Sequence, residues 1–349
     1  MRRPIRESRI FVILLIGVFA LAAAGSAQSF RPKRTGPSFG FKFSGGLGYA
    51  FDGGGDLENL RNGDLNYLAD LGTETGMTVT TNWKKMSFLP NFDADLIFFI
   101  TPNIGIGLGS GYISAQTKGE LGWNYQYSGS EWWGTYMYDI ADSWTREYKV
   151  SAIPVRLSVY FSMPMNRLNV YGYVGAGYYF GKLDHSRLED GTLNYEDSSW
   201  YYWNEIWENT SQSTITETAK SNALGFHGGL GAEFMIGSNL ALGVEVFGRF
   251  VNFNSWEGDY NYQETTHSRK WMESYGWYLD ETDTFTWSES GKLWYYEIFD
   301  QDYNHQYGEM YIWQDQPDDP SYRNVRPAAI NLNAVGIKLS LRIFFNLFK

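Results

Sequence analysis

Eight segments of this chain alternate large apolar residues with small or polar ones, and this period of two constrains the fold more than any other feature. In the first segment, Phe39, Phe41 and Phe43 alternate with Lys42 and Ser44. The eight segments span residues 39–51, 86–100, 104–111, 153–161, 170–180, 224–236, 240–250 and 335–345. Because successive side chains of a strand point to opposite faces, each segment predicts a β-strand with one apolar face and one small, polar face.

The connections between these segments alternate in length, which restricts the architecture further. Three are short turns, at residues 101–103, 162–167 and 237–239. Four are long loops, at residues 52–83, 117–147, 183–221 and 252–327. A soluble sandwich seldom tolerates a loop as long as the last one. Short turns on one side and long loops on the other predict an all-β fold, an eight-stranded antiparallel transmembrane β-barrel with long β-rich extracellular loops.

The first 27 residues have the pattern of a secretory signal peptide. Four arginines precede an apolar run at residues 10–24, and Gly25, Ser26 and Ala27 supply small residues for cleavage. The alternative is an N-terminal anchor helix, although the run is short for a membrane span. We therefore expect a signal peptide at 1–27, a periplasmic tail at 28–37 and the barrel at 38–349.

The placement of charges independently favours a membrane barrel. The long loops contain all 14 tryptophans and all but four acidic residues of the mature chain, and those four lie on the small, polar faces of the strands. No charged residue lies on the apolar faces, where a charge at the bilayer midplane would cost roughly 2–4 kcal/mol. The net charge of −11 argues against a nucleic-acid partner. The absence of cysteine excludes disulfides and thiolate metal sites.

Two motifs and the last strand resemble a known group. The motifs are Ala-Ile-Pro-Val-Arg-Leu at 152–157 and Tyr-Val-Gly-Ala-Gly-Tyr-Tyr-Phe at 173–180, and the last strand is apolar. Together with the alternation, they resemble the small outer-membrane β-barrels of the OmpX/OmpW type. The resemblance covers the strands and not the long loops. It implies eight strands, both termini in the periplasm, and insertion by the barrel-assembly machinery into the outer membrane of a Gram-negative cell.

Ten ionisable residues on the small, polar faces are candidates for a charge network in the barrel lumen. They are Lys42, Asp93, Asp95, Arg156, His227, Glu233, Glu245, Arg249, Lys338 and Arg342. If each short turn pairs the residues that flank it, every acid faces a glycine, which leaves room for a long basic side chain from another strand. We expect Glu233 and Glu245 to pair with bases drawn from Arg156, Arg249, Lys338 and Arg342. Since an eight-stranded barrel is just wide enough for side chains, this network is expected to be a structural plug, with a proton or ion path as the alternative.

The long loops carry local structural patterns of their own. Residues 121–138 and 285–298 predict hairpins that turn at 128–130 and 288–291. Leucines at 57, 60, 65, 68 and 71 have helical spacing, interrupted by Gly63. They predict one or two short helices over the barrel mouth, with Asp56 and Asp64 as possible N-caps.

Two sets of loop and rim residues are candidates for binding. The aromatic candidates are Trp132, Trp133, Trp200, Trp203, Trp294 and Tyr296. They could bind an extracellular glycan or protein, or they could pack together to stiffen the loops. The basic candidates are Lys84, Lys85, Lys149 and Lys182. They could contact lipopolysaccharide phosphates, or they could form a generic interfacial rim.

The residues give little sign of catalysis or of a bound cofactor. The four histidines do not form a recognisable catalytic pattern, and the acids at 52 and 56 and at 318–319 suggest calcium only loosely. We expect no catalytic residue, cofactor or metal. The leading expectation is a non-enzymatic outer-membrane protein for envelope integrity or surface binding, in contact with outer-membrane lipid and lipopolysaccharide. The alternatives are OmpW-like passage of small hydrophobic molecules and a lipid A-modifying barrel enzyme.

Overall fold

The computed structural model describes residues 37–132, 134–199, 204–237, 239–273, 275–300 and 305–346. The predicted signal peptide, most of the predicted tail, and Trp133, Trp200 and Trp203 lie outside these residues. The elements are β1 (Ser38–Ala50), α2 (Asp56–Leu71), β2 (Met77–Trp83), β3 (Phe88–Phe99), β4 (Ile104–Glu131), β5 (Gly134–Met165), β6 (Leu168–Ser199), β7 (Glu205–Met235), β8 (Leu240–Phe253), β9 (Glu257–Met272), β10 (Gly276–Asp300), β11 (His305–Trp313), β12 (Tyr322–Pro327), β13 (Ile330–Asn331) and β14 (Ala334–Asn346). The predicted all-β, antiparallel class is confirmed. Among the described residues, no helix has the length and apolar character needed to cross a membrane.

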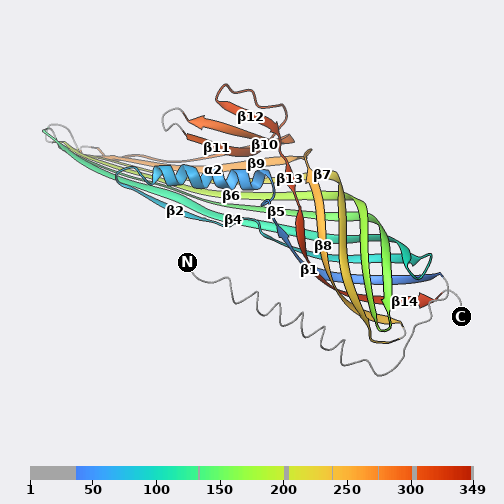
Figure 1. The fold of residues 1–349 in the computed structure, drawn as a ribbon. Coiled ribbons are helices and arrows are strands. Elements are labelled where there is room, and N and C mark those ends of the chain that lie inside the picture. Colours follow the sequence, from blue (N-terminus) through green and yellow to red (C-terminus); the bar gives the residue numbers. More distant parts are fainter. Residues whose placement is uncertain are drawn as a thin grey trace, which may run out of the picture.

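Eight of the described strands pair in a closed ring. In order, the ring contains β1, β3, β4, β5, β6, β7, β8 and β14, and β14 returns to β1. Every pairing is antiparallel, so the chain runs up and down around the ring (Figure 1). These are the eight segments whose alternation predicted strands.

The ring has an apolar outside and a charged inside. Leu224 is 76% exposed on the outer surface, whereas the side chains of Glu233 and Arg342 on the inner face are completely buried. This arrangement is the reverse of a water-soluble domain and follows directly from the period of two, because each strand gives one parity to each face. Exposed large apolar residues occur on all eight ring strands, and exposed apolar surface on this scale marks a site of contact with a membrane or a protein partner.

Four of the ring strands, β4, β5, β6 and β7, continue beyond the ring and form a long open sheet together with three further strands. We call this sheet the blade. It consists of β2, β9, residues 276–291 of β10, and the outer parts of β4 to β7, at residues 114–149 and 182–221. The strand order is β2-β4-β5-β6-β7-β9-β10. Figure 1 shows the blade extending away from the ring, with α2 lying along it. The long segments are therefore mostly strand, which confirms the prediction that the loops are β-rich.

Both predicted hairpin turns were placed wrongly. Residues 128–130 lie inside β4, whose last pair is Glu131 with Gly134. Gly129 does not turn the chain. It makes room for the Tyr136 ring, which would lie 2.4 Å from a Cβ at this position. Residues 288–291 lie inside β10. At Gly291 the Trp313 carbonyl leaves no room for a side chain, and beyond it β10 exchanges its partner β9 for β11 and β12.

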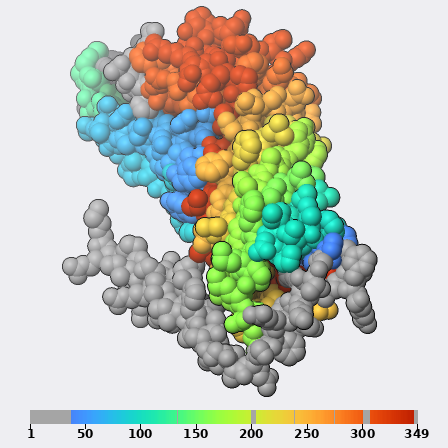
Figure 2. Space-filling model, turned by 45° about the vertical axis from the view of Figure 1, so that its right-hand side comes forward, coloured from blue at the N-terminus to red at the C-terminus, as the bar shows by residue number. Residues whose placement is uncertain are grey.

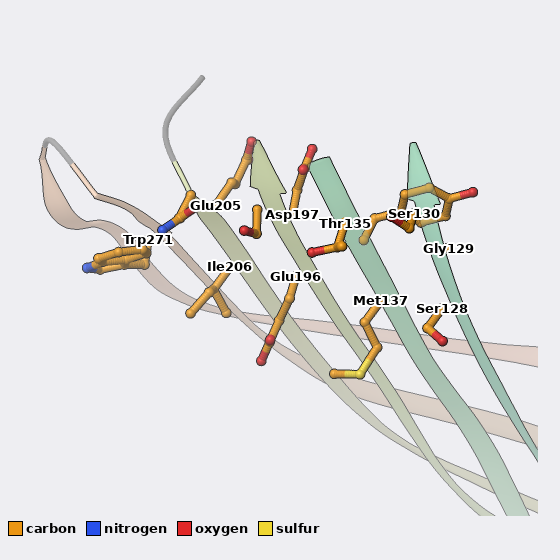
Figure 3. Close-up of a pocket in the computed structure, with 13 residues that line it drawn as sticks. Ser128, Gly129, Ser130, Thr135, Met137, Glu196, Asp197, Glu205, Ile206 and Trp271 are labelled. Carbon is orange, nitrogen blue, oxygen red and sulfur yellow. The ribbon is translucent and has the colours of Figure 1, made fainter. Parts of the chain in front are cut away.

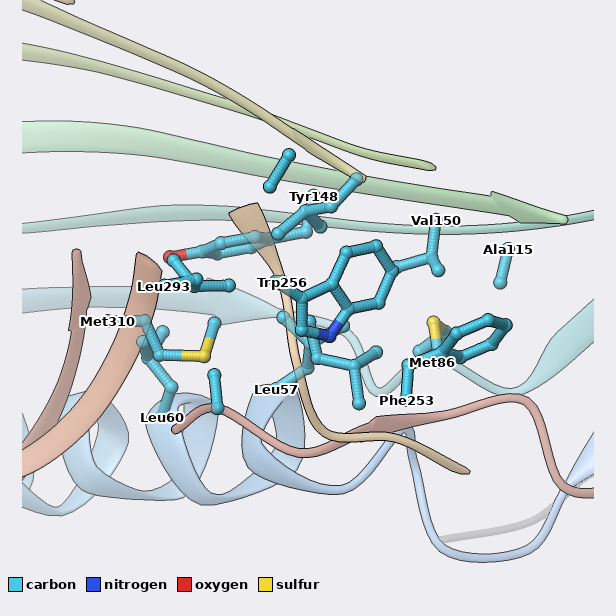
Figure 4. Close-up of a cluster of buried hydrophobic side chains, with 14 of the residues drawn as sticks. Leu57, Leu60, Met86, Ala115, Tyr148, Val150, Phe253, Trp256, Leu293 and Met310 are labelled. Atoms are coloured by element: carbon cyan, nitrogen blue, oxygen red, sulfur yellow. The ribbon is translucent and has the colours of Figure 1, made fainter. Parts of the chain in front are cut away.

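A second layer, which we call the cap, covers one face of the blade. It consists of α2, β11, β12 and the end of β10 (residues 292–300), and its orange and red residues lie above the blue α2 in Figure 2. Leu57, Leu60 and Leu68 are buried, as their helical spacing predicts, and pack against Tyr148 and Met310 (Figure 4). The helix stays continuous through Gly63, where it approaches the backbone of Tyr307 and Gly308 closely.

The predicted N-caps of the helix are wrong. The cap position is Gly55, Asp56 is the first helical residue, and Asp64 lies in mid-helix. The carboxylate of Asp56 is bound by the Arg326 guanidinium at 2.5 and 2.6 Å, and it accepts the Ala329 N–H at 2.7 Å. Asp56 thus joins the start of α2 to the chain that returns to the ring.

Candidate functional site

The inner face of the ring holds a chain of ion pairs that joins six residues, and a separate ion pair between Arg342 and Glu233. Arg342 Nε lies 2.9 Å from Glu233 Oε1. Lys42 Nζ pairs with Glu245 Oε2, and Lys338 Nζ lies 3.9 Å from Glu245 Oε1 and 2.6 Å from Asp93 Oδ2. Arg156 bridges two acids, at 2.6 Å from Asp93 Oδ1 and 3.1 Å from Asp95 Oδ1. All of these groups are buried.

The partners of the two glutamates differ in part from those expected. Glu233 pairs with Arg342, one of the four expected bases, and also accepts the Asn169 side-chain N–H at 3.0 Å. For Glu245 the nearest base is Lys42, which the expected set omitted, and Lys338 is more distant. Lys42 lies on β1 and Glu245 on β8, and β14 lies between these two strands. The pair therefore cannot be predicted from the pairing of adjacent strands.

The glycines opposite the acids are in the expected register but serve a different purpose. Asp95 faces Gly109, and Glu245 faces Gly231. A Cβ at position 109 would lie 1.9 Å from the Asp95 carboxylate, and one at position 231 would lie 2.6 Å from the Tyr171 ring. The space is therefore filled by the acid itself or by a tyrosine, and not by a long basic side chain from another strand.

Tyrosines complete the network, and the sequence reasoning missed them. Tyr171 and Tyr173 donate hydrogen bonds to Glu245, at 2.8 and 3.1 Å, and Tyr160 packs beside them. Lys42 Nζ lies 4.9 Å from the Tyr173 ring centroid, within cation–π range. The available signal was parity, since Tyr171 and Tyr173 alternate with the apolar residues of their strand.

The remaining lumen candidates lie nearer the blade. His227 faces Arg249 in register, as expected, and its Nε2 lies 2.8 Å from Ser158 Oγ. Arg249 donates from Nε to the Leu332 carbonyl at 3.0 Å. Above these groups, Phe253, Trp256, Ile330 and other buried side chains fill the end of the ring. The lumen is thus occupied by side chains from the charged network to the base of the blade.

A second buried ionic cluster joins the cap to the blade. Arg146 of β5 lies 3.3 Å from Asp64 Oδ2 of α2 and 2.8 Å from Glu309 Oε1 of β11. Beside it, His185 Nδ1 lies 2.7 Å from Glu217 Oε2, and the other oxygen of Glu217 accepts the Ile312 N–H at 3.1 Å. One blade face thus presents charged partners to two elements of the cap, α2 and β11.

Burial and neighbouring charges shift the pKa values of Asp64 and Arg146. Desolvation raises the pKa of Asp64 to about 6, even though Arg146 opposes the shift. The carboxylates of Asp64 and Glu309 raise the pKa of Arg146 well above its ordinary value, against the effect of burial. Near neutral pH, Asp64 is therefore ionised although it is buried. The attraction of Arg146 offsets the desolvation cost of this charge only in part.

The raised pKa of Asp64 predicts a pH dependence of cap stability. The folded protein binds a proton at Asp64 more readily than the unfolded chain does, so stability should decrease as pH rises from about 4 to about 6. In Asp64→Asn this decrease should be absent. The measurement is chemical unfolding of the cap across this pH range, followed by tryptophan fluorescence. Identical pH profiles for the two proteins would contradict the prediction.

The structure separates the predicted surface aromatics into two groups. Trp132 is 82% exposed at the end of the blade. Trp294 and Tyr296 are only 9% and 2% exposed, so their assignment to a binding surface is wrong. They lie in the part of β10 that β11 and β12 enclose, and Tyr296 stacks on Tyr322 at 4.4 Å. Because β10 is paired on both sides here, its aromatics form the interior of the cap.

A different set of aromatics lies in a straight line across the blade. Tyr127, Tyr138, Tyr195 and Trp207 are direct cross-strand partners on β4, β5, β6 and β7. We call them the aromatic row. They share the parity of Arg146, and so lie on the capped face, but beyond the end of α2 at Leu71, and all four are exposed or half-buried. The sequence contains these residues, but only the strand register aligns them.

A groove of about 650 Å³ lies at the same end of the blade (Figure 3). Its lining includes Tyr136, Met137 and Trp271, the carboxylates of Glu196, Asp197 and Glu205, and no basic side chain. Lys270 forms an ion pair with Glu205, and Tyr195 donates a hydrogen bond to Asp197 at 3.0 Å. The outer end of the blade therefore combines exposed rings with hydrogen-bond acceptors.

The predicted lysine rim is only partly assembled. Lys149 and Lys182 lie on the outer surface where the ring meets the blade, and Lys220, which the prediction did not include, lies beside Lys182 in register. Lys182 pairs with Asp184 at 2.7 Å. Lys85 lies apart from them, 3.6 Å from Glu58 of α2, and Lys84 is exposed.

Asp52 and Asp56, two of the suggested calcium ligands, have protein partners. Asp52 accepts hydrogen bonds from Gly54 N–H and the Asn333 side chain, and Asp56 is bound to Arg326. The intervening Gly53, Gly54 and Gly55 all have positive φ, which glycine adopts without strain. Within the described part of the chain, no cluster of three potential metal ligands is present.

Comparison with known proteins places the chain near no established family. No family model matches it, and no curated protein matches it. Among solved structures it is similar to the outer membrane protease OmpT from Escherichia coli, with 9% identity, a TM-score of 0.21, and coverage of 92% of this chain and 99% of that chain. It is also similar to the outer membrane transporter YddB from Escherichia coli, with 7% identity, a TM-score of 0.11, and coverage of 87% and 80%. It is similar as well to the siderophore receptor PirA from Pseudomonas aeruginosa, with 9% identity, a TM-score of 0.09, and coverage of 88% of this chain and 80% of that chain. TM-scores this low assign neither a fold family nor a function.

Proposed function

We propose that this protein is a non-enzymatic, eight-stranded outer-membrane β-barrel that holds a rigid, acidic blade outside the cell for surface binding. The closed ring supports the barrel, because its outside is apolar and its charges face inward, as hydrocarbon requires. The packed lumen favours an anchor over a passage for hydrophobic molecules. The bacterial outer membrane, reached through a signal peptide, is the compartment that fits such a barrel.

His185, His227 and His267, the three histidines whose side chains the structure describes, favour a non-enzymatic role over a lipid A-modifying enzyme. His185 and His227 are buried under the cap and inside the ring. His267 lies on the open blade, 2.8 Å from Thr282 Oγ1 and 3.4 Å from Asp280 Oδ1. General acid–base catalysis needs such a group to be positioned against a bound substrate, and the groove lined by Tyr136 and Trp271 does not include His267.

The aromatic row carries the proposal for binding. Its residues repeat at the spacing of neighbouring strands, about 4.8 Å, and form a continuous strip of aromatic side chains across four strands. Asp197 and Asn209 lie beside the strip, each two residues from a ring on the same strand and face. Stacking surfaces with adjacent hydrogen-bond acceptors suit the apolar faces and hydroxyls of a neutral glycan. The four long segments carry 34 acidic and 10 basic residues, which disfavours a polyanionic partner.

Tyr138→Ala with Tyr195→Ala should abolish glycan binding. The two rings lie 4.7 Å apart in the middle of the row, and truncating aromatic residues at the centre of a binding surface typically weakens binding strongly. The measurement is affinity electrophoresis of the detergent-solubilised protein through neutral β-glucan, mannan or galactan. Leu188→Ala, an exposed apolar residue on the opposite face of the blade, is the matched control. Failure of all three polysaccharides to retard the unaltered protein would contradict the proposal.

An epitope inserted between Thr73 and Thr75 should be accessible to antibody on intact cells. These residues form the exposed turn between α2 and β2, so the insertion should not disturb the blade. Antibody binding to whole cells, measured by flow cytometry, checks the orientation. Binding only after the outer membrane is permeabilised would place the blade in the periplasm and contradict the proposed topology.

A further inference from the structure

The blade ends in a long strand edge with no partner. β9 pairs with β10 from Gly276 to Lys292 on one side. On the other side, β11 pairs only with residues 292–300, and within the described ranges no strand pairs with residues 276–290 there. The strand β12 pairs with residues 294–298 on the side of β9. Such an edge presents a row of unpaired N–H and C=O groups.

Lysine and proline, which often protect an edge strand, are missing here, and the charges that this edge carries are all acidic. Residues 279–291 contain no lysine and no proline, and the register irregularity of β10 lies at the start of the strand, between Trp277 and Leu279. The side chains from Asp280 to Ser288 are exposed. Proteins normally shield edges with Lys, Pro, bulges or covering segments. At the opposite edge of the blade, β2 is only seven residues long.

The charge of this edge selects its partner. Residues 279–291 contain four acids and no base. His267 and Arg269 approach Asp280 at 3.4 and 3.7 Å, whereas Glu281 and Asp283 have no ion-pair partner among the described residues. Pairing with a second copy would bring two acidic strands together, which like charges on neighbouring strands oppose.

We propose that residues 279–288 of β10 bind an extended, basic segment of another protein by strand addition. Backbone hydrogen bonds would extend the sheet, and lysines or arginines of the added strand would face Glu281 and Asp283. The exposed Phe285 and Trp287 would flank the added strand on one face. The inference rests on the proposed function only in that the blade faces outside the cell, and it does not involve the aromatic row.

The first test uses the full-length protein in detergent and a ten-residue peptide that alternates lysine with threonine and valine. Hydrogen exchange in residues 279–288 should slow when the peptide is added, and exchange in β2 should not. A peptide with glutamate in place of lysine should have no effect. Unchanged exchange in residues 279–288, or equal slowing in β2, would overturn the proposal.

Two further probes separate strand addition from simple charge attraction. The lysine peptide methylated on alternate backbone nitrogens keeps its charge but loses its N–H donors, and should bind at least tenfold more weakly. The double variant Glu281→Gln, Asp283→Asn should bind the unmethylated peptide more weakly, whereas Glu120→Gln on β4 should bind it normally. Equal affinity of the methylated peptide would show binding by charge alone and refute strand addition. The Tyr138→Ala, Tyr195→Ala variant should bind the peptide normally, so failure of glycan binding and failure of this inference are distinguishable.

Discussion

Arg146→Gln should release the cap from the blade and leave the ring folded. The Arg146 guanidinium is almost completely buried and contacts the carboxylates of Asp64 in α2 and Glu309 in β11, two of the elements of the cap. Its removal leaves both carboxylates buried without a cation, and breaking a buried pair in this way costs about 3–5 kcal/mol. Hydrogen exchange should increase across α2 and β11, and a protease should cut the exposed turn at residues 73–75 and then degrade α2.

The control for this variant is Lys118→Gln on the same sheet. Lys118 pairs with Glu120 at 3.1 Å, but both side chains are about half exposed, and such surface pairs contribute about 0–1 kcal/mol. Exchange in α2 should therefore stay unchanged. If Arg146→Gln behaves like Lys118→Gln, the cluster does not hold the cap. Arg146→Met combined with Asp64→Leu and Glu309→Gln should restore protection, because it removes the buried charges together.

Glu245→Gln should lower the unfolding temperature of the detergent-solubilised ring. Glu245 pairs with Lys42 and accepts hydrogen bonds from Tyr171 and Tyr173. The substitution leaves the buried ammonium of Lys42 without a carboxylate, at a cost of about 3–5 kcal/mol. The apparent unfolding temperature can be followed by the mobility shift of the folded form in electrophoresis or by circular dichroism.

Glu120→Gln is the matched control for Glu245→Gln. It makes the same chemical change at a half-exposed glutamate of the blade, where solvent replaces the lost contact. Equal unfolding temperatures for the two variants would mean that the lumen network does not stabilise the ring. A lower unfolding temperature for Glu245→Gln but not for Glu120→Gln would show that the charges inside the ring stabilise it.

Short-range pattern in the sequence was enough to predict the ring strands and the faces of their side chains. Alternation assigns Phe41 to one face and Lys42 to the other whatever the strand pairs with, because a strand has a period of two. A three-residue turn then aligns the strands that flank it, which is why the Asp95 and Gly109 pairing was predictable. The helix follows in the same way from its leucines.

The tertiary structure decided which distant groups meet. The pairing of Lys42 with Glu245 depends on which side chains reach across the lumen, and no turn encodes that distance. The burial of Trp294 and Tyr296 depends on both neighbours of β10. The aromatic row aligns only because four strands, each about 30 residues long, keep one register far from the ring, and a shift of one residue would move each ring to the opposite face. Composition and periodicity thus determined the ring strands and the identity of their apolar and charged faces, whereas pairing between residues distant in sequence created the blade, its cap and its exposed edge.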